Sequence, residues 1–295
     1  MKFVLASNIL EHPGFPAFIS AAIAAYPDIN FLVAGDLLNI FPEPGENLEG
    51  SIFYQLYGNL IFEGMNNLVN SDFRDTHNSL FIEPLKNMFL LTGNRFYEAK
   101  NIACQRYKKL FANLEASLEN SHLYFIPGNM DYPSLSGNLT INSPRLHQID
   151  NDVFEKDGIR IGGIGGVPNT VHPFKGVVEI SPYEMAESEY EKRLNQLWGV
   201  EILITHVSPE EFPVLRNFLI ESPLKLLICR APFNFRHKSD FRGKLEFEAI
   251  GDKYVIKVRP FDYPENKAYV IDIVPGITPL LVEVFSWRAS KISGI

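Results

Sequence analysis

The first 36 residues decide the fold: KFVLAS at residues 2–7 is followed by FPAFISAAIAA at 15–25 and by FLVAGD at 31–36. The first and third segments are short apolar runs, which is the pattern of strands covered on both faces. The middle segment carries Pro at its second position and then small and apolar residues, which favours a helix. A strand, a helix and a second strand in this order form a βαβ unit, so we expect the two strands to be parallel.

The alternation of helices and strands continues after this unit. Apolar and aromatic residues recur at helical spacing between residues 38 and 121, and the clearest helix there is FYEAKNIACQRYKKLFANLEASLEN at 96–120. Further strands are expected at 122–129, 153–158, 159–166, 201–206 and 225–230, with helices at 182–197 and 211–219. From residue 244 onward the pattern changes to short strands separated by turns, which favours antiparallel pairing. The chain is therefore predicted to be an α/β protein with a β-rich C-terminal part.

Composition limits the classes of partner. The chain has 295 residues with 27 Lys and Arg against 35 Asp and Glu, giving a net charge of −8. An acidic chain is a poor match for nucleic acid, because phosphate binding needs clustered cations. No uncharged apolar run approaches the ~20 residues that cross a bilayer, so we expect no membrane span. Two cysteines cannot build a disulfide scaffold, which fits the cytoplasm. The oligomeric state is not predictable from these features.

Polar side chains stand at the C-terminal ends of five predicted strands. They are Asn8, Asp36, Asn129, His206 and Arg230. In open α/β sheets ligands bind outside the carboxyl ends of the strands, so these five residues could share one site. Each of them alone is more often a turn or capping residue than a ligand. We predict a site because all five residues lie at the C-terminal ends of strands.

The order of these residues resembles the motif order of the calcineurin-like metallophosphoesterase family. The Gly-Asp motif of that family corresponds to residues 35–39 (GDLLN), its Gly-Asn motif to 128–131 (GNMD), and its lone histidine to His206. The stretch GGIGGVP at 162–168 matches the glycine-rich segment between the third and fourth motifs. The resemblance implies a four-layer αββα sandwich of two mixed sheets, formed by residues 1–295 as one domain. It also implies that residues 38–121 are a helical insertion, longer than usual in the family.

The resemblance also marks positions that lack the expected donor. The family carries Asp-x-His in its first motif, an Asp where this chain has Asn39, a leaving-group histidine in its third motif and Gly-His-x-His in its last. Here the corresponding residues are Asn8-Ile9-Leu10, Asn39, Met130 and Cys229-Arg230-Ala231-Pro232. The remnant metal ligands are therefore Asp36, Asn129 and His206, with Asn8 as a weak fourth donor. Asp131 is expected to brace its loop.

Charge decides how much metal this donor set could hold. The family site binds two divalent cations that orient a phosphate and activate water. Asp36 is the one carboxylate left, and Arg230 would cancel its charge. We therefore expect either no metal or one divalent ion (Mn, Fe, Zn or Mg), since three protein ligands and water suffice for an open site. A full two-metal centre is not expected.

Two interpretations of Arg230 remain open. Its guanidinium could pair with Asp36 in place of a metal, or bind a phosphate together with Asn39 and Asn8. Alternatively, Arg230 is an ordinary surface arginine. Loop residues could also replace lost ligands if their loops fold inward, and the candidates are Glu11, His12, His172 and His237.

Three functions follow from these features. The first is a divergent metallophosphoesterase-fold protein with lost or much reduced activity, binding a phosphorylated ligand or a protein partner at the remnant site. The second is an active metal-dependent phosphoesterase that uses one metal or substitute ligands. The third is a scaffold that acts through the insertion at residues 38–121.

Overall fold

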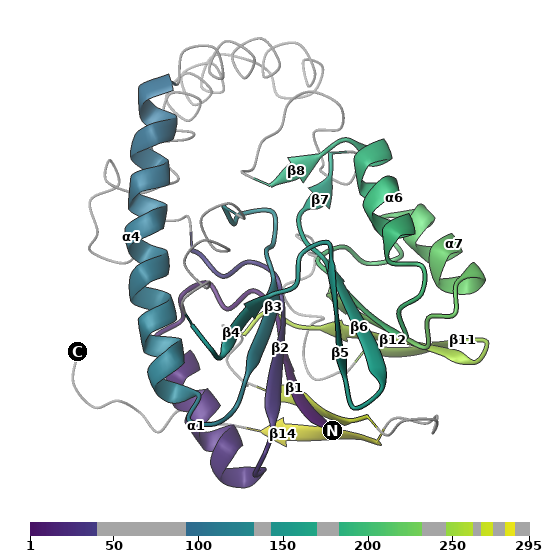
Figure 1. Cartoon of the computed structure of the whole chain (residues 1–295), viewed down its shortest axis with the longest axis horizontal. Coiled ribbons are helices and arrows are strands. Elements are labelled where there is room, and N and C mark those ends of the chain that lie inside the picture. Colours follow the sequence, from purple (N-terminus) through teal and green to yellow (C-terminus); the bar gives the residue numbers. More distant parts are fainter. Residues whose placement is uncertain are drawn as a thin grey trace, which may run out of the picture.

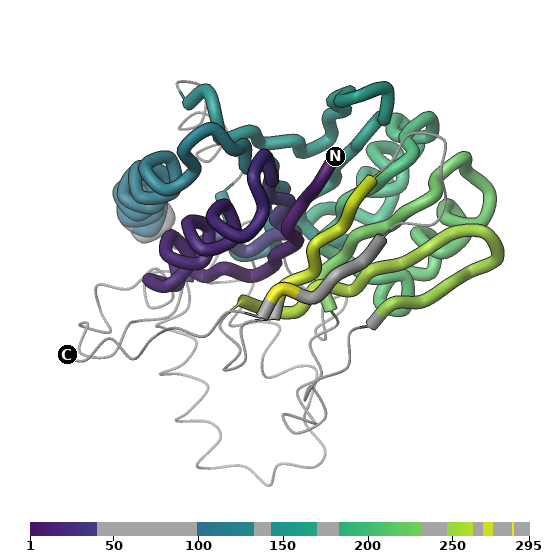
Figure 2. Tube along the Cα trace, turned by 90° about the horizontal axis from the view of Figure 1, so that it is seen from below, coloured from purple at the N-terminus to yellow at the C-terminus, as the bar shows by residue number. Residues whose placement is uncertain are grey.

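We describe the fold from a computed structural model of the chain, which describes residues 1–39, 93–132, 143–169, 183–231, 246–261, 267–273 and 281–286. The described part forms two mixed six-stranded sheets, with helices on their outer faces (Figure 1). Seen from below, the two sheets lie between α1 and α4 on one flank and α6 and α7 on the other (Figure 2). The α/β sandwich of two mixed sheets is therefore confirmed.

The first sheet has the strand order β14-β13-β1-β2-β3-β4. Its strands are β1 (Lys2–Ala6), β2 (Asn30–Ala34), β3 (Leu123–Ile126), β4 (Leu146–Gln148), β13 (Lys267–Asp272) and β14 (Leu281–Ser286). β1 and β2 are parallel, with Val4 opposite Phe31, as the opening βαβ unit predicts. The connecting helix α1 (Phe15–Ala25) begins and ends at the predicted residues.

The second sheet has the order β11-β12-β10-β9-β6-β5. Its strands are β5 (Asp152–Lys156), β6 (Ile159–Ile164), β9 (Ile202–Thr205), β10 (Leu226–Arg230), β11 (Glu246–Ile250) and β12 (Lys253–Val258). A separate pair is formed by β7 (Val167–Pro168) and β8 (Glu184–Met185). The helices α6 (Glu187–Gln196) and α7 (Pro213–Glu221) cover this sheet, close to the predicted ranges.

The C-terminal strands depart in part from the antiparallel expectation. β11 and β12 pair antiparallel, as do β13 and β14, but β12 is parallel to β10. The four strands also divide between the two sheets rather than forming one. The reason is that each hairpin extends an existing sheet edge, β12 beside β10 and β13 beside β1.

Three apolar layers hold the sandwich together. On β1 and β2, Val4 and Val33 face α1 and α4, while Leu5 and Leu32 face the second sheet. This alternation follows from the period of two in a strand. A third layer packs β9 and β10 against α6 and α7. The strand ends that carry polar residues are therefore fixed by buried packing on both faces.

The predicted insertion at residues 38–121 is described only in part. α4 (Gly93–Ser117) covers most of the predicted helix at 96–120 and packs Tyr107, Leu110 and Leu114 against the first sheet. Residues 40–92 lie outside the described residues, so the rest of the insertion remains a prediction. No helix among the described residues combines the length and apolarity that a bilayer crossing demands.

Candidate functional site

The loops that follow β1 and β2 run side by side and present the first two site residues. Three backbone hydrogen bonds join them, from the N–H groups of Asn8, Leu10 and Glu11 to the carbonyls of Gly35, Asp36 and Leu37. Asn8, Leu10, Glu11 and Asp36 all have positive φ, between 42° and 53°. A left-handed backbone conformation is unusual for residues other than glycine, and it is kept only where surrounding contacts hold the chain in it. The two loops thus form one fixed unit that sets the direction of Asn8 and Asp36.

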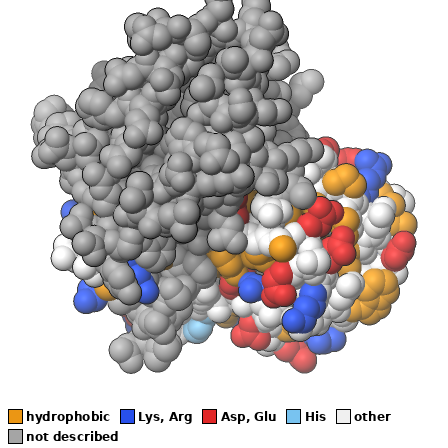
Figure 3. All heavy atoms as spheres, turned by 90° about the horizontal axis from the view of Figure 1, so that it is seen from above, with side chains coloured by type: hydrophobic (Ala, Val, Ile, Leu, Met, Phe, Trp, Pro, Cys, Tyr) orange, Lys and Arg blue, Asp and Glu red, His pale blue; other side chains and the backbone are white. Residues whose placement is uncertain are grey.

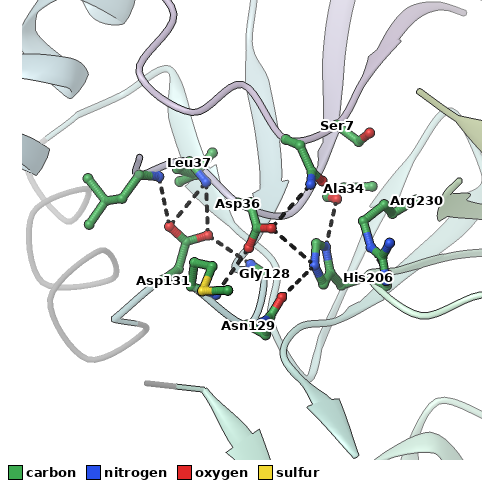
Figure 4. Close-up of polar contacts among 12 residues, drawn as sticks. Ser7, Ala34, Asp36, Leu37, Gly128, Asn129, Asp131, His206 and Arg230 are labelled. Carbon is green, nitrogen blue, oxygen red and sulfur yellow. Dashed lines mark hydrogen bonds and ion pairs between the residues drawn. The ribbon is translucent and has the colours of Figure 1, made fainter. Parts of the chain in front are cut away.

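Four of the five predicted site residues meet at one point (Figure 4). The Asp36 Oδ2 atom lies 3.2 Å from the Asn8 amide nitrogen, which donates to it, and 3.5 Å from His206 Nε2. The other carboxylate oxygen accepts from the backbone N–H of Met130 at 3.1 Å. The amide oxygen of Asn129 lies 3.1 Å from His206 Nε2. Asn8, Asp36 and His206 are buried, so this is a dense polar cluster.

The protonation of His206 can be argued from its partners. Its Nδ1 lies 3.1 Å from the carbonyl oxygen of Ala34, which can only accept, so Nδ1 carries a proton. In a neutral ring Nε2 then has a bare lone pair, yet it faces oxygen atoms of Asp36 and Asn129. Three arrangements satisfy this contact: a cation bound between the three side chains, a second proton on the ring, or an Asn129 amide turned so that its NH2 group donates to Nε2.

The electrostatics of Asp36 agree with a cationic neighbour. Burial alone would raise the pKa of Asp36, but His206, the Met130 N–H and Arg230 together outweigh it and leave the pKa below its usual value. Asp36 is therefore ionised at neutral pH and carries the negative charge of the cluster.

Two glycines make this close approach possible. A Cβ atom on Gly35 would lie 2.0 Å from His206 Nδ1, and one on Gly128 would lie 2.0 Å from Asp36 Oδ1. No side chain fits in either place without displacing the cluster. The glycines of the Gly-Asp and Gly-Asn motifs thus serve packing, since only a bare backbone leaves room for the polar side chain opposite.

Asp131 braces the loops, as predicted. Its carboxylate accepts hydrogen bonds from the backbone N–H groups of Leu37, Leu38 and Gly128 and from the Tyr107 hydroxyl at 2.8 Å. Tyr107 also accepts from the backbone N–H of Tyr132. Burial and the nearby Asp36 raise the pKa of Asp131 to about 6. The side chain therefore ties α4 and the loops after β2 and β3 into one frame.

Arg230 has a different partner from the one considered in the sequence analysis. It lies on the far side of His206 from Asp36 (Figure 4). Its Nη2 pairs with Glu211 at 2.9 Å, and its Nε donates to the carbonyl of His206 at 3.2 Å. The residue is only 7% exposed, so it is not a surface arginine either. Its charge reaches Asp36 as a weak lowering of the carboxyl pKa, without a direct ion pair.

The other candidates are accounted for as follows. Glu11 forms an ion pair with Arg106 and accepts from the backbone N–H of Asn39. His12 Nδ1 accepts from the N–H of Gly14, and its ring packs edge-on against Phe261. These contacts engage Glu11 and His12 in positioning the loop, which argues against their use as replacement ligands. His172, His237 and Pro232 lie outside the described residues.

The donor set can be tested for its fit to metal ions. For two ions the fit fails, because Leu10 has no donor atom and Asn8 turns its amide N–H, not its oxygen, to Asp36. Nowhere in the described ranges do three His, Cys, Asp or Glu side chains gather at metal-binding distance. For one ion the fit is acceptable, since Asp36 Oδ2, His206 Nε2 and Asn129 Oδ1 converge.

Several residues of the site have no signal in the sequence. Arg106 and Tyr107 reach the site from α4, and Glu211 reaches it from the loop before α7. The partner of each lies 19 to 95 residues away in the sequence. Such pairs depend on the three-dimensional arrangement alone. The one available indication is the helical spacing of α4, which places Arg106 and Tyr107 on or near its buried side.

Comparison with known proteins supports the fold. No family model matches the chain, and no curated protein matches it. Among solved structures, TT1561 of Thermus thermophilus superposes with a TM-score of 0.58 at 12% identity, covering 97% of this chain and 98% of that one. A second crystal structure has a TM-score of 0.60 at 14% identity and similar coverage. NAD nucleotidase of Haemophilus influenzae matches over 50% of its own length, with a TM-score of 0.48 and 12% identity. The likeness to the first two structures covers nearly the whole chain and shows that they share this two-sheet α/β fold.

Proposed function

We propose that this protein is a metallophosphoesterase-fold binding protein with lost or much reduced hydrolase activity. The observation that carries the proposal is the state of Asp36. Its carboxylate faces the Asn8 amide, the Met130 N–H and His206, so three protein groups occupy the surroundings that metal ions need. Met130 also stands where a leaving-group acid would be, and a thioether cannot donate a proton.

The ligand we propose is a phosphorylated small molecule or a protein partner that binds where the loops after β1, β2 and β3 meet. This position outside the carboxyl ends of the strands favours ligand binding in α/β folds. Both nearby arginines are already paired, Arg230 with Glu211 and Arg106 with Glu11. An anionic ligand therefore has to draw on a protonated His206 or to displace a glutamate.

The surface supports a small ligand or protein over a polyanion. On the described part of the face seen in Figure 3, basic and acidic side chains are interspersed. Together with the net charge of −8, this argues against a nucleic-acid partner. The absence of a membrane partner, a cytoplasmic location and a scaffold role of the insertion at residues 38–121 also stay proposals.

The decisive experiment measures metal and turnover on the full chain. Elemental analysis of the purified protein is expected to find fewer than two metal ions per chain. In the presence of Mn, Fe, Zn or Mg, we expect the wild type to hydrolyse p-nitrophenyl phosphate and bis-p-nitrophenyl phosphate no faster than the variants Asp36→Asn and His206→Gln. Two bound metals per chain, or turnover lost in both variants, would overturn the proposal.

A stability measurement separates an internal ion pair from an empty metal site. In chelator, Asp36→Asn is expected to lower the free energy of unfolding by about 1–3 kcal/mol, because it leaves buried donors without their acceptor. The matched control is Asp28→Asn, which removes the same charge at an exposed position. Burial opposes the ionised form of Asp36, so a carboxylate without these partners would gain stability on replacement by Asn. A stabilised Asp36→Asn would therefore contradict the proposed cluster.

A single-metal phosphoesterase is the second candidate, favoured by the convergence of Asp36, His206 and Asn129. His206 has its Nδ1 fixed on a backbone carbonyl, an arrangement that orients metal-binding histidines. A bound ion would polarise a phosphate oxygen and lower the pKa of water. One equivalent of tightly bound Zn²⁺ or Mn²⁺, lost in Asn129→Ala and accompanied by turnover, would favour this candidate over the first.

A further inference from the structure

A second pair of titratable side chains lies at the opposite end of β3 from the candidate site. His122 precedes β3, and His147 lies in the neighbouring strand β4. His122 Nδ1 and His147 Nε2 are 2.9 Å apart, and the two ring planes are inclined by 25°. Two ring nitrogens at this distance need one proton between them, because two lone pairs or two N–H groups repel.

Pro144 fixes which histidine donates. The backbone of Pro144 raises the pKa of His147, and a proline has only a carbonyl to offer, so we assign the donated proton to His147. Since Nε2 already faces His122, the donated proton is on Nδ1. His147 Nε2 therefore accepts, and His122 Nδ1 donates. A first extra proton can bind to His122 Nε2, which takes no part in the hydrogen bond between the rings. A second extra proton has to bind to His147 Nε2, which then can no longer accept that hydrogen bond.

Charged neighbours from three other segments oppose that second proton. Lys156 of β5 and Arg145 before β4 disfavour positive charge on the pair, while Glu115 of α4 favours it. Glu115 is itself paired with Arg145 at 3.2 Å, which weakens its help. Burial, the largest cause, holds the pKa of both histidines below the usual value. Lys156 and Arg145 lower the pKa of His122 further, and His122 and Lys156 lower that of His147. The buried Tyr124, whose own pKa is raised by burial, adds no charge at neutral pH.

The pair is also connected to the second sheet through a stack of rings. His147 stacks on Tyr124 of β3 with ring centres 4.9 Å apart, and Tyr124 stacks on Phe154 of β5 at 4.3 Å. β4 and β5 are the terminal strands of their sheets. The stack therefore closes the sandwich at the edge where these two strands lie (Figure 1).

We propose that the His122–His147 pair is a pH-sensitive latch, which holds β4 on β3 and closes this edge while it carries at most one extra proton. A second extra proton breaks the hydrogen bond between the rings and places two positive charges beside Lys156 and Arg145. The edge strand β4, which has only three residues, then separates from β3. This inference does not depend on the proposed function.

A pH titration of the full chain, followed by NMR of the histidine rings, tests the latch. We expect His122 to protonate first and His147 to keep its neutral Nδ1–H form to a pH below the ordinary 6.5. Amide exchange in β4 is expected to accelerate when His147 protonates. Independent titration of both rings near 6.5, or β4 exchange that ignores their protonation, would overturn the proposal.

Variants separate the latch from general acid unfolding. His147→Gln keeps an acceptor and a donor but cannot titrate, so the acid-triggered exchange of β4 should disappear. His12→Gln removes a histidine outside the pair and should leave that response unchanged. If His147→Gln does not fold, His122→Gln serves the same purpose, because the new amide can turn from donor to acceptor and keep its hydrogen bond when His147 Nε2 is protonated. An acid response of β4 that survives in both pair variants contradicts the latch.

Discussion

At the residue scale, the candidate site depends on positions where nothing but hydrogen fits. The carboxylate of Asp36 fills the space beside Gly128. A Cβ atom on Gly128 would lie only 2.0 Å from Asp36 Oδ1. Gly251 in the β11–β12 turn is the useful contrast, because it has positive φ but open space around it. The two glycines therefore separate the effect of crowding from that of backbone conformation.

Gly128→Ala is predicted to lower the free energy of unfolding by more than about 3 kcal/mol, because the new methyl group has to displace a buried carboxylate. Gly251→Ala should cost only about 1–2 kcal/mol, the strain of a left-handed residue. Urea unfolding of the two variants gives both values. Equal costs would mean that the space opposite Asp36 does not constrain the site.

Asp131 gives a pH dependence of known sign. Its pKa of about 6 lies above that of the unfolded chain, so the native state binds the proton more tightly. The resulting stabilisation is present below about pH 4 and is lost as the pH rises through 6. Relative to Asp131→Asn, the wild type should therefore lose stability between about pH 4 and 6 in urea titrations at fixed pH values. A wild type that gains stability relative to Asp131→Asn over this range would show a low pKa instead.

At the element scale, the ion pair between Arg230 and Glu211 joins the end of β10 to the loop before α7. The same guanidinium donates to the His206 carbonyl at the end of β9. Three elements of the second sheet thus meet at one buried cation. The pair explains why an arginine can end the buried strand β10 without reaching solvent.

Arg230→Met is predicted to destabilise the protein by about 3 kcal/mol, because it removes one partner of a mostly buried pair. Glu211→Gln alone should cost a similar amount, while the double variant should cost less than the sum of the two. A double-mutant cycle in urea measures this coupling. Strictly additive effects would show that the two side chains do not stabilise each other.

The sequence predicts elements better than it predicts partners. Apolar runs with clear boundaries, such as those of β1, α1 and β2, are correct because buried packing on both faces dictates them. The short β4 is missed, because three residues carry too little pattern. The strand-end residues Asn8, Asp36, Asn129 and His206 are brought together as expected. The ion-pair partner of Arg230 was not predictable in this way. Whether Arg230 pairs with Asp36 or with Glu211 depends on the three-dimensional arrangement, which the spacing of residues in the sequence does not indicate.

At the scale of the whole molecule, central and terminal strands differ in how well they are protected. β2 lies inside the first sheet with both faces buried, whereas β11 is a terminal strand whose Phe247 is 44% exposed. Opening of the edge should need less free energy than opening of the centre.

Native-state hydrogen exchange is therefore predicted to be slowest in β1 and β2 and fastest, among the strands, in β11. The expected gap is on the order of 10³-fold, since the centre opens only with global unfolding. Mass spectrometry of exchanged peptides resolves these strands. Comparable rates in β2 and β11 would indicate that the sandwich opens as one unit.

The hydrogen bond from His206 to Ala34 joins residues that are 172 positions apart and belong to different sheets. Such a contact closes a very long loop, so it can form only late in folding, after the sheets have met. The NMR signal of His206 therefore records the final docking step. In a refolding experiment it should become native-like after the βαβ unit at the start of the chain, which makes this histidine a natural reporter of the order of events.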